Sequence, residues 1–114
     1  MATAAHRLGA RGEDRAARLY ADAGYEILAR NWRVPDGELD LVAGAPGLLV
    51  FVEVKTRSSD AFGHPAEAVT PAKQERIHRL AAQFCTTTGE RRARHRFDVV
   101  AIIGPRIDVL EDCF

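Results

Sequence analysis

The chain has 114 residues, of which 46% are hydrophobic and 28% charged, and its formal net charge at pH 7 is zero. This length and composition predict one soluble globular domain spanning residues 1–114. Two cysteines are too few for a disulfide scaffold, and the longest apolar run, Leu48 to Val52, is too short to span a membrane. The sequence also shows no signal-peptide pattern, so we expect a cytoplasmic protein.

The order of apolar residues, glycines and prolines predicts a helix, three strands, a second helix and two more strands. The first helix is predicted over residues 9–23 and ends at Gly24. Strands are predicted over residues 25–32, 39–42 and 48–54, with turns between them at 35–37 and 43–47. The third strand is almost continuously apolar, which predicts burial on both faces at the centre of the sheet.

A loop is predicted over residues 58–69, and the second helix follows it over residues 70–87. Thr70 is its expected N-cap, Pro71 its first helical residue, and the helix is expected to stop near Gly89. The apolar stripe of this helix comprises Ile77, Leu80, Ala81 and Phe84. Strands over residues 97–103 and 107–110 complete a mixed sheet flanked by helices, which is an α/β architecture.

Charged residues at the end of the third strand suggest a functional site. Glu53 and Lys55 continue the strand face that begins with the apolar Leu49 and Phe51, which indicates a strand that leaves the core at a cleft. The alternative is a salt-bridge ladder on a solvent-facing sheet end. Asp40 lies on the preceding strand. The alternative to a functional role for Asp40 is that of a hydrogen-bonded residue at a sheet edge. Two acids on neighbouring strands favour a Mg²⁺ or Mn²⁺ site, because these ions prefer oxygen ligands.

Glu13 lies on the face of the first helix that should turn toward the protein. That face carries apolar or aromatic neighbours: Ala16, Ala17 and Tyr20. The opposite face carries charged ones: Arg11, Arg15, Arg18 and Asp22. Considered alone, Glu13 is better explained as a peripheral residue bonded to an arginine or a helix end. Lys73 and Gln74 flank the buried stripe at the start of the second helix. They could reach into the cleft, but exposure to solvent is the favoured expectation.

Residues 91–96 contain four arginines and no acid: Arg91, Arg92, Arg94 and Arg96. Arginine suits bidentate phosphate contacts, so we expect these residues to form a phosphate-contacting surface together with Arg33 and Arg57. The favoured alternative on charge alone is a solvated basic loop. The neutral net charge argues mildly against a nucleic-acid-binding protein, whose affinity depends mainly on phosphate contacts.

Taken in order, these motifs resemble the PD-(D/E)XK nuclease superfamily and, more closely, the YraN-like family of small bacterial proteins. The matching segments are Gly12-Glu13, Asn31-Trp32-Arg33, Gly37-Glu38-Leu39-Asp40-Leu41-Val42, Phe51-Val52-Glu53-Val54-Lys55-Thr56-Arg57 and Arg96-Phe97-Asp98-Val99-Val100. The layout is also similar to that of archaeal Holliday-junction resolvases. The superfamily's Pro-Asp pair is absent at Asp40, where Leu39 precedes; Glu38 is kept as a helper of Asp40.

The resemblance implies a restriction-endonuclease-like fold and metal-dependent cleavage of nucleic acid, with branched DNA in repair or recombination as one candidate substrate. It implies that Asp40, Glu53 and the Val54 carbonyl hold Mg²⁺ or Mn²⁺ and that Lys55 orients or activates the attacking water. Glu13 would assist this ion or hold a second one. The alternative is a non-catalytic, nuclease-derived nucleic-acid-binding or scaffold protein. The oligomeric state is left open between a monomer and a homodimer.

Overall fold

The computed structural model describes residues 4–57 and 69–114. Its elements follow in the order α1 (Ala4–Asp22), β1 (Glu26–Val34), β2 (Gly37–Ala45), β3 (Leu48–Arg57), α2 (Pro71–Thr88), β4 (Arg94–Ile103) and β5 (Arg106–Leu110). Each predicted helix and strand is confirmed, although their ends differ by up to five residues. The loop predicted over residues 58–69 falls outside the described residues except for Val69. Neither described helix has the length and apolarity needed to cross a membrane.

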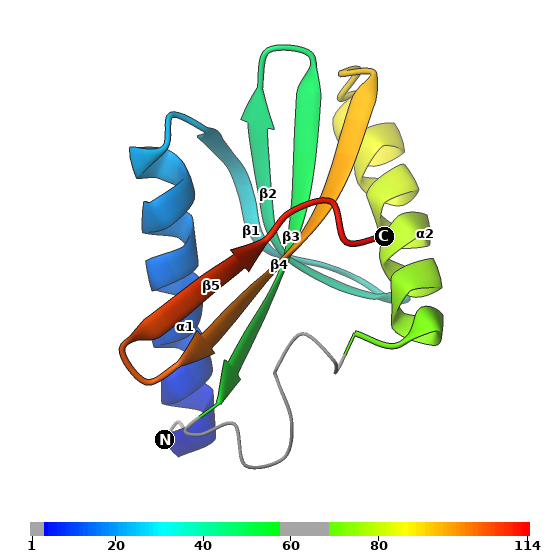
Figure 1. The fold of residues 1–114 in the computed structure, drawn as a ribbon. Coiled ribbons are helices and arrows are strands. Elements are labelled where there is room, and N and C mark those ends of the chain that lie inside the picture. Colours follow the sequence, from blue (N-terminus) through cyan, green and yellow to red (C-terminus); the bar gives the residue numbers. More distant parts are fainter. Residues whose placement is uncertain (1–3, 58–68) are drawn as a thin grey trace.

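The five strands form one mixed sheet in which spatial order equals chain order. β2 is antiparallel to both β1 and β3, β3 and β4 are parallel, and β5 returns antiparallel to β4. The parallel step requires a crossover connection, and α2 supplies its helix. α1 and α2 lie on opposite sides of the sheet (Figure 1). This is an α/β fold with a mixed sheet flanked by helices, compatible with the restriction-endonuclease-like architecture.

The central position predicted for β3 is confirmed by burial on both of its faces. Leu49 and Phe51 belong to the apolar cluster beneath α2, whereas Val50 and Val52 belong to the cluster beneath α1. All four side chains are at most 3% exposed. β3 therefore leaves the core only at its carboxyl-terminal end, where the charged residues begin.

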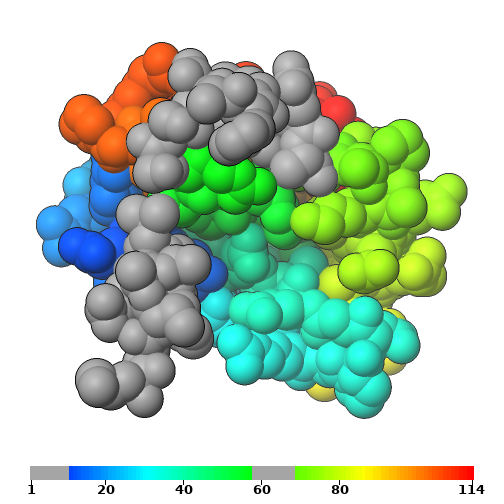
Figure 2. All heavy atoms as spheres, turned by 90° about the horizontal axis from the view of Figure 1, so that it is seen from below, coloured from blue at the N-terminus to red at the C-terminus, as the bar shows by residue number. Residues whose placement is uncertain are grey.

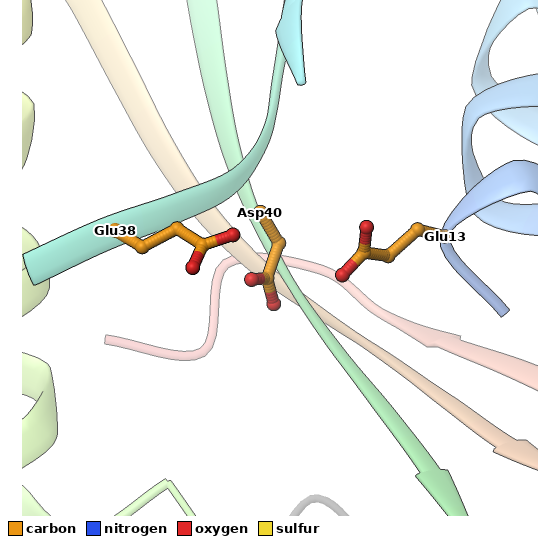
Figure 3. Close-up of side chains that lie close together, drawn as sticks. All are labelled: Glu13, Glu38 and Asp40. Carbon is orange, nitrogen blue, oxygen red and sulfur yellow. The ribbon is translucent and has the colours of Figure 1, made fainter. Parts of the chain in front are cut away.

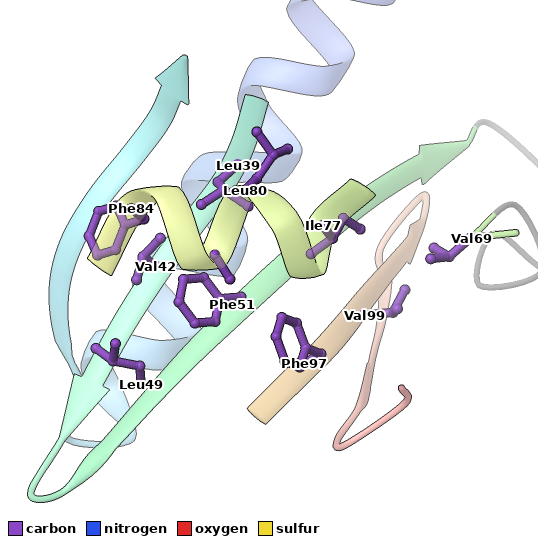
Figure 4. Packing of buried hydrophobic residues seen from close by; sticks show 11 residues of the cluster. Leu39, Val42, Leu49, Phe51, Val69, Ile77, Leu80, Phe84, Phe97 and Val99 are labelled. Carbon is purple, nitrogen blue, oxygen red and sulfur yellow. The ribbon is translucent and has the colours of Figure 1, made fainter. Parts of the chain in front are cut away.

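α2 has the ends and the buried face that its sequence predicts. The Thr70 side chain accepts a hydrogen bond from the Lys73 N–H, and Pro71 opens the helix. Gly89 ends it at φ 75°, a left-handed conformation that glycine adopts without strain. The buried stripe comprises Ile77, Leu80, Ala81 and Phe84. Figure 4 shows three of these side chains directed at apolar residues of β2, β3 and β4.

Small residues let α1 lie close to β3. Ala16 is fully buried, and a Cβ atom added at Gly12 would overlap the hydroxyl group of Thr56 on β3. The helix begins at Ala4, earlier than predicted, and its inward face carries Ala16, Ala17 and Tyr20 as expected. Since Glu13 follows Gly12 directly, this close contact brings its carboxylate to the carboxyl-terminal half of β3.

Candidate active site

The site begins where β2 separates from β3. The backbone pairing of these strands ends at Leu41 and Val52. Beyond that pair, the Val54 N–H donates a hydrogen bond of 2.9 Å to Oδ2 of Asp40. A side-chain carboxylate thus takes the place of a backbone acceptor, while the β1–β2 hairpin bends toward α2 (Figure 1). Asp40 is held against β3 at the point where the sheet opens.

Three carboxylates gather at this opening. One oxygen each from Glu13, Glu38 and Asp40 lies within 4.8 Å of the others. Figure 3 shows Asp40 between Glu38, from the same strand, and Glu13, from α1. Burial raises the pKa of Glu13, and repulsion from Asp40 and Glu38 raises it further, although a hydrogen bond with Asn31 opposes this. The arrangement disfavours full ionisation and would be stabilised by a cation.

Glu53 and Lys55 form a second charged group beside the first. Their side chains are each 14% exposed, and Lys55 Nζ lies 3.3 Å from Oε1 of Glu53. Glu53 also lies close enough to Asp40 for each carboxylate to shift the pKa of the other. Burial, followed by repulsion from Asp40, raises the pKa of Glu53 to about 7, although Lys55 opposes this. Asp40 thus links the three-carboxylate group to the Glu53–Lys55 pair.

The structure therefore brings together all four side chains that the sequence singles out for catalysis: Glu13, Asp40, Glu53 and Lys55. The backbone of Val54, the third predicted ligand, is tied to Asp40 by its N–H. Seen from the end where β3 finishes, β2 and β3 form the floor of a hollow bordered by α1, β1 and α2 (Figure 2). The catalytic and ligand roles of these residues remain predictions.

Two neighbours of the site receive little or no role from the sequence. Glu38, kept only as a helper, is a full member of the carboxylate group, and Arg33 Nε lies 3.2 Å from it. Asn31 belongs to a matched motif but has no assigned role. It occupies the left-handed region at φ 51°, which asparagine tolerates better than most residues, and its side chain bonds Glu13. An Asn inside a predicted strand, near its end, is the signal that the sequence offers.

The predicted arginine surface is not brought together. β3 and β4 run parallel with Leu48 opposite Arg94 and Glu53 opposite Val99. Five strand residues separate Arg94 from the level of Glu53, a span of roughly 16 Å. The segment 91–96 thus lies toward the β2–β3 turn, whereas Arg57 ends β3 on the side of the carboxylates. Residues 94–96 also belong to β4 rather than to a loop.

Two of these arginines already bind acidic residues of the protein itself. Arg96 donates two hydrogen bonds, of 3.0 and 2.9 Å, to the fully buried Asp98. Asp98 also accepts from the Tyr20 hydroxyl and from the N–H of Asp112, so it ties α1 to β4 and to the last residues. Arg92 pairs with two acids, Glu26 and Glu90. Arg91 and Arg94 are exposed, at a distance from the carboxylates.

On α1, Arg11 and Arg18 are exposed as expected, but Arg15 is half-buried. Its guanidinium donates hydrogen bonds of 2.7 and 2.9 Å to the carbonyl oxygens of Gly104 and Pro105. The expected solvent-facing stripe is therefore wrong at Arg15, because the β4–β5 turn reaches this side of the helix. The phase of the helix nevertheless places Glu13 inward.

Comparison with known proteins agrees with this motif pattern. A family model described as uncharacterised protein family UPF0102 matches residues 12–102, a range that includes Glu13, Asp40, Glu53 and Lys55. A UPF0102 protein of Rhodococcus jostii is 53% identical over 112 residues, covering 94% of this chain and 95% of the relative.

Two further relatives show the same agreement in other bacteria. A UPF0102 protein of Beutenbergia cavernae is 54% identical over 99 residues, covering 87% of this chain and 84% of its own. A UPF0102 protein of Moorella thermoacetica is 50% identical over 96 residues, which cover 84% of this chain and 80% of the relative. The chain therefore belongs to the UPF0102 family, the YraN-like family that its motifs resemble.

Proposed function

We propose that this protein is a metal-dependent nuclease of the PD-(D/E)XK type that hydrolyses phosphodiester bonds in nucleic acid, with DNA as the expected substrate. The observation that carries the proposal is Asp40, which links the Glu13–Glu38 carboxylates to the Glu53–Lys55 pair. The fold supports it, because two antiparallel strands, a crossover helix and a parallel strand hold these residues at one opening. Membership of the UPF0102 family does not by itself indicate an activity, so the proposal rests on the site and the fold.

The donor set suits a hard divalent ion. The oxygens of Glu13, Glu38 and Asp40 lie within 4.8 Å of one another, so small side-chain movements would bring them to the spacing of oxygen ligands around Mg²⁺ or Mn²⁺. Asp40 and Glu53 would hold the ion with the Val54 carbonyl, as the sequence motif implies, and Glu13 and Glu38 would extend the ligand set. The ion would polarise a phosphoryl oxygen and lower the pKa of a bound water.

Lys55 would act on the substrate and not on the ion. An ammonium group has only hydrogen-bond donors, so it cannot ligate a metal. Its contact with Glu53 holds the charge in place beside the carboxylates. A fixed cation there would stabilise the negative charge that grows on the phosphate in the transition state. Arg33 and Arg57, at the same end of the sheet, would contact neighbouring phosphates.

A non-catalytic nucleic-acid-binding or scaffold protein is the second candidate. The observation in its favour is that arginines expected to bind phosphate are paired with acids inside the protein, notably Arg92 and Arg96. Metal-dependent strand cleavage distinguishes the two candidates, because a binding protein would retain the fold and the contacts without cutting.

The test is a cleavage assay on branched, single-stranded and duplex DNA and on RNA, with Mg²⁺, Mn²⁺ or a chelator. We expect wild type to cut at least one substrate only with a divalent ion. Asp40→Asn should reduce the rate at least about 100-fold, as loss of a key electrostatic group typically does. Asp22→Asn, an exposed change at the end of α1, is the matched control and should cut normally. Absence of cleavage on every substrate would favour the binding protein.

A further inference from the structure

Lys73 has a fixed position at the start of α2. The Thr70 hydroxyl accepts from its backbone N–H at 3.3 Å, so Lys73 lies in the first helical turn. The Gln74 side chain donates a 3.2 Å hydrogen bond to the carbonyl of Val69, which is 7% exposed in the core beneath α2. Four residues after Lys73, the buried Ile77 marks the face of the helix that turns to the sheet.

Glu53 and Lys55 continue the face of β3 that lies beneath α2, because Phe51 on that face belongs to the cluster under this helix. Lys73 lies one turn before Ile77 on the side of α2 that turns to the sheet, so it faces these residues. Contact with Lys55, followed by burial, lowers the pKa of Lys73, whereas attraction to Glu53 and Asp40 opposes this. The expectation of a solvent-exposed lysine is therefore wrong, and the side chain is half-buried. Figure 2 shows α2 forming one wall of the hollow whose floor is β2 and β3.

Lysine is rare in this chain, and both lysines belong to this part of the structure. Among the 16 basic residues of the chain, only Lys55 and Lys73 are lysines, and these two meet at the site. Two ammonium groups in contact repel each other, and a cation in the first turn of a helix also opposes the helix dipole. The first turn of α2 has no acidic residue that would offset either effect. The compensation comes instead from the carboxylates of Glu53 and Asp40 on the neighbouring strands.

The carboxylates near the lysines are the groups that a divalent ion would occupy. Once Asp40 and Glu53 were shared with an ion, they would compensate the lysines less, and both ammonium groups would require another acceptor. A phosphodiester offers two non-bridging oxygens, and each can accept from one lysine.

We propose that Lys73 is a second phosphate-contacting cation of the candidate active site and binds the nucleic-acid backbone beside Lys55. The inference rests on the proposed function for its substrate class. It assigns Lys73 a contact with a phosphate group, whereas the ion and the attacking water remain with the carboxylates and Lys55.

The test measures the salt dependence of DNA and RNA binding with Ca²⁺ in place of Mg²⁺ or Mn²⁺, so that the carboxylates hold an ion, together with cleavage in Mg²⁺ or Mn²⁺. Loss of one phosphate contact in Lys73→Ala should reduce the slope of log affinity against log salt by about 0.7–0.9. Its cleavage rate should fall roughly tenfold or more, since a group that stabilises transition-state charge is removed. Lys73→Arg keeps the charge and should restore the slope.

Two controls separate this contact from a loss of charge or of structure. Arg79→Ala removes an exposed cation from the same helix and should leave the slope and rate unchanged. The melting temperature of Lys73→Ala should stay close to that of wild type, so that a lower slope cannot come from loss of structure. A wild-type slope in Lys73→Ala overturns the inference, as does a wild type that binds neither DNA nor RNA.

The two proposals fail in different ways. If wild type cuts and Lys73→Ala retains both slope and rate, the inference about Lys73 is wrong and the proposed function stands. If wild type binds but never cuts, and Lys73→Ala still flattens the slope, the phosphate contact stands and the proposed function fails.

Discussion

Asp40 has neighbours of three kinds: a backbone N–H from Val54, the carboxylates of Glu13 and Glu38, and the Glu53–Lys55 pair. The N–H lowers its pKa, but burial raises the pKa by more, and repulsion from Glu38 adds to the effect of burial. A protein that only needed stability would gain by replacing such a group with apolar residues. The residues at this opening are therefore better explained by ligand binding than by folding.

The raised pKa of Glu53 has a consequence for stability in the metal-free protein. Burial and Asp40 raise the pKa to about 7, from 4.5 for an ordinary Glu, so the unfolded chain loses this proton at lower pH than the folded protein. The free energy of unfolding should therefore fall as pH rises from about 4.5 to 7 and level off above it.

Replacing Glu53 by Gln should remove this loss of stability. We expect Glu53→Gln to exceed wild type in free energy of unfolding by roughly 1–3 kcal/mol at pH 8, and by much less at pH 4.5. Chemical denaturation in chelator at both pH values measures the difference, and Glu75→Gln, an exposed change on α2, is the control. If the two proteins differed in free energy of unfolding by the same amount at both pH values, Glu53 would ionise as readily in the folded protein as in the unfolded chain.

At the residue scale, sequence periodicity and motif resemblance were enough to select Glu13, Asp40, Glu53 and Lys55. They were not enough for Glu38 and Lys73, because the proximity of those residues depends on the bending of the β1–β2 hairpin and on the position of α2. Local periodicity reports which face a side chain occupies, but it does not report which distant element covers that face.

At the element scale, α1 is the part of the fold on which the position of Glu13 depends. Gly12 lies against Thr56 of β3 and near Ile102 of β4, and its missing side chain sets the distance between helix and sheet. The helix carries Glu13 at the next residue, so a displacement of α1 changes the carboxylate group directly.

Gly12→Ala should therefore destabilise the protein, although alanine is favoured over glycine by about 1 kcal/mol in an unobstructed helix. We expect a net loss of about 1–3 kcal/mol from overpacking, measured by chemical denaturation. Adding Thr56→Ala removes the overlapping hydroxyl and should recover most of the lost free energy of unfolding. A double-mutant cycle would measure this recovery as a coupling free energy between the two positions. A more stable Gly12→Ala would show that α1 is not limited by this contact.

The elements themselves follow from local signals, and their ends show what those signals omit. The caps and the apolar stripe of α2 were predicted because Thr70, Pro71 and Gly89 act within a few residues. β3 extends to Arg57 and β4 begins at Arg94, beyond the predicted limits, because each pairs with the other across more than 35 residues of chain. Pairing between strands so far apart in the chain is not visible in the local sequence, so the charged ends of these strands could not be predicted from it.

At the scale of the whole molecule, the sheet separates two charged regions that the sequence could not distinguish. The carboxylates and both lysines lie where β3 ends, whereas residues 91–96 lie toward the β2–β3 turn. The neutral net charge thus conceals a local arrangement of acids and lysines at one opening. The substrate contacts in this account belong to that opening, and its chemistry depends on Lys55 being close to the carboxylates without being a metal ligand.

The most direct test of the central claim is the single-turnover rate of Mn²⁺-dependent DNA cleavage by wild type and Lys55→Ala, at Mn²⁺ concentrations shown by calorimetry to saturate both proteins. The account predicts that Lys55→Ala binds Mn²⁺ about as well as wild type and cuts at least roughly 100-fold more slowly, because only the cation that faces the phosphate is lost. Equal cleavage rates for the two proteins would contradict the account.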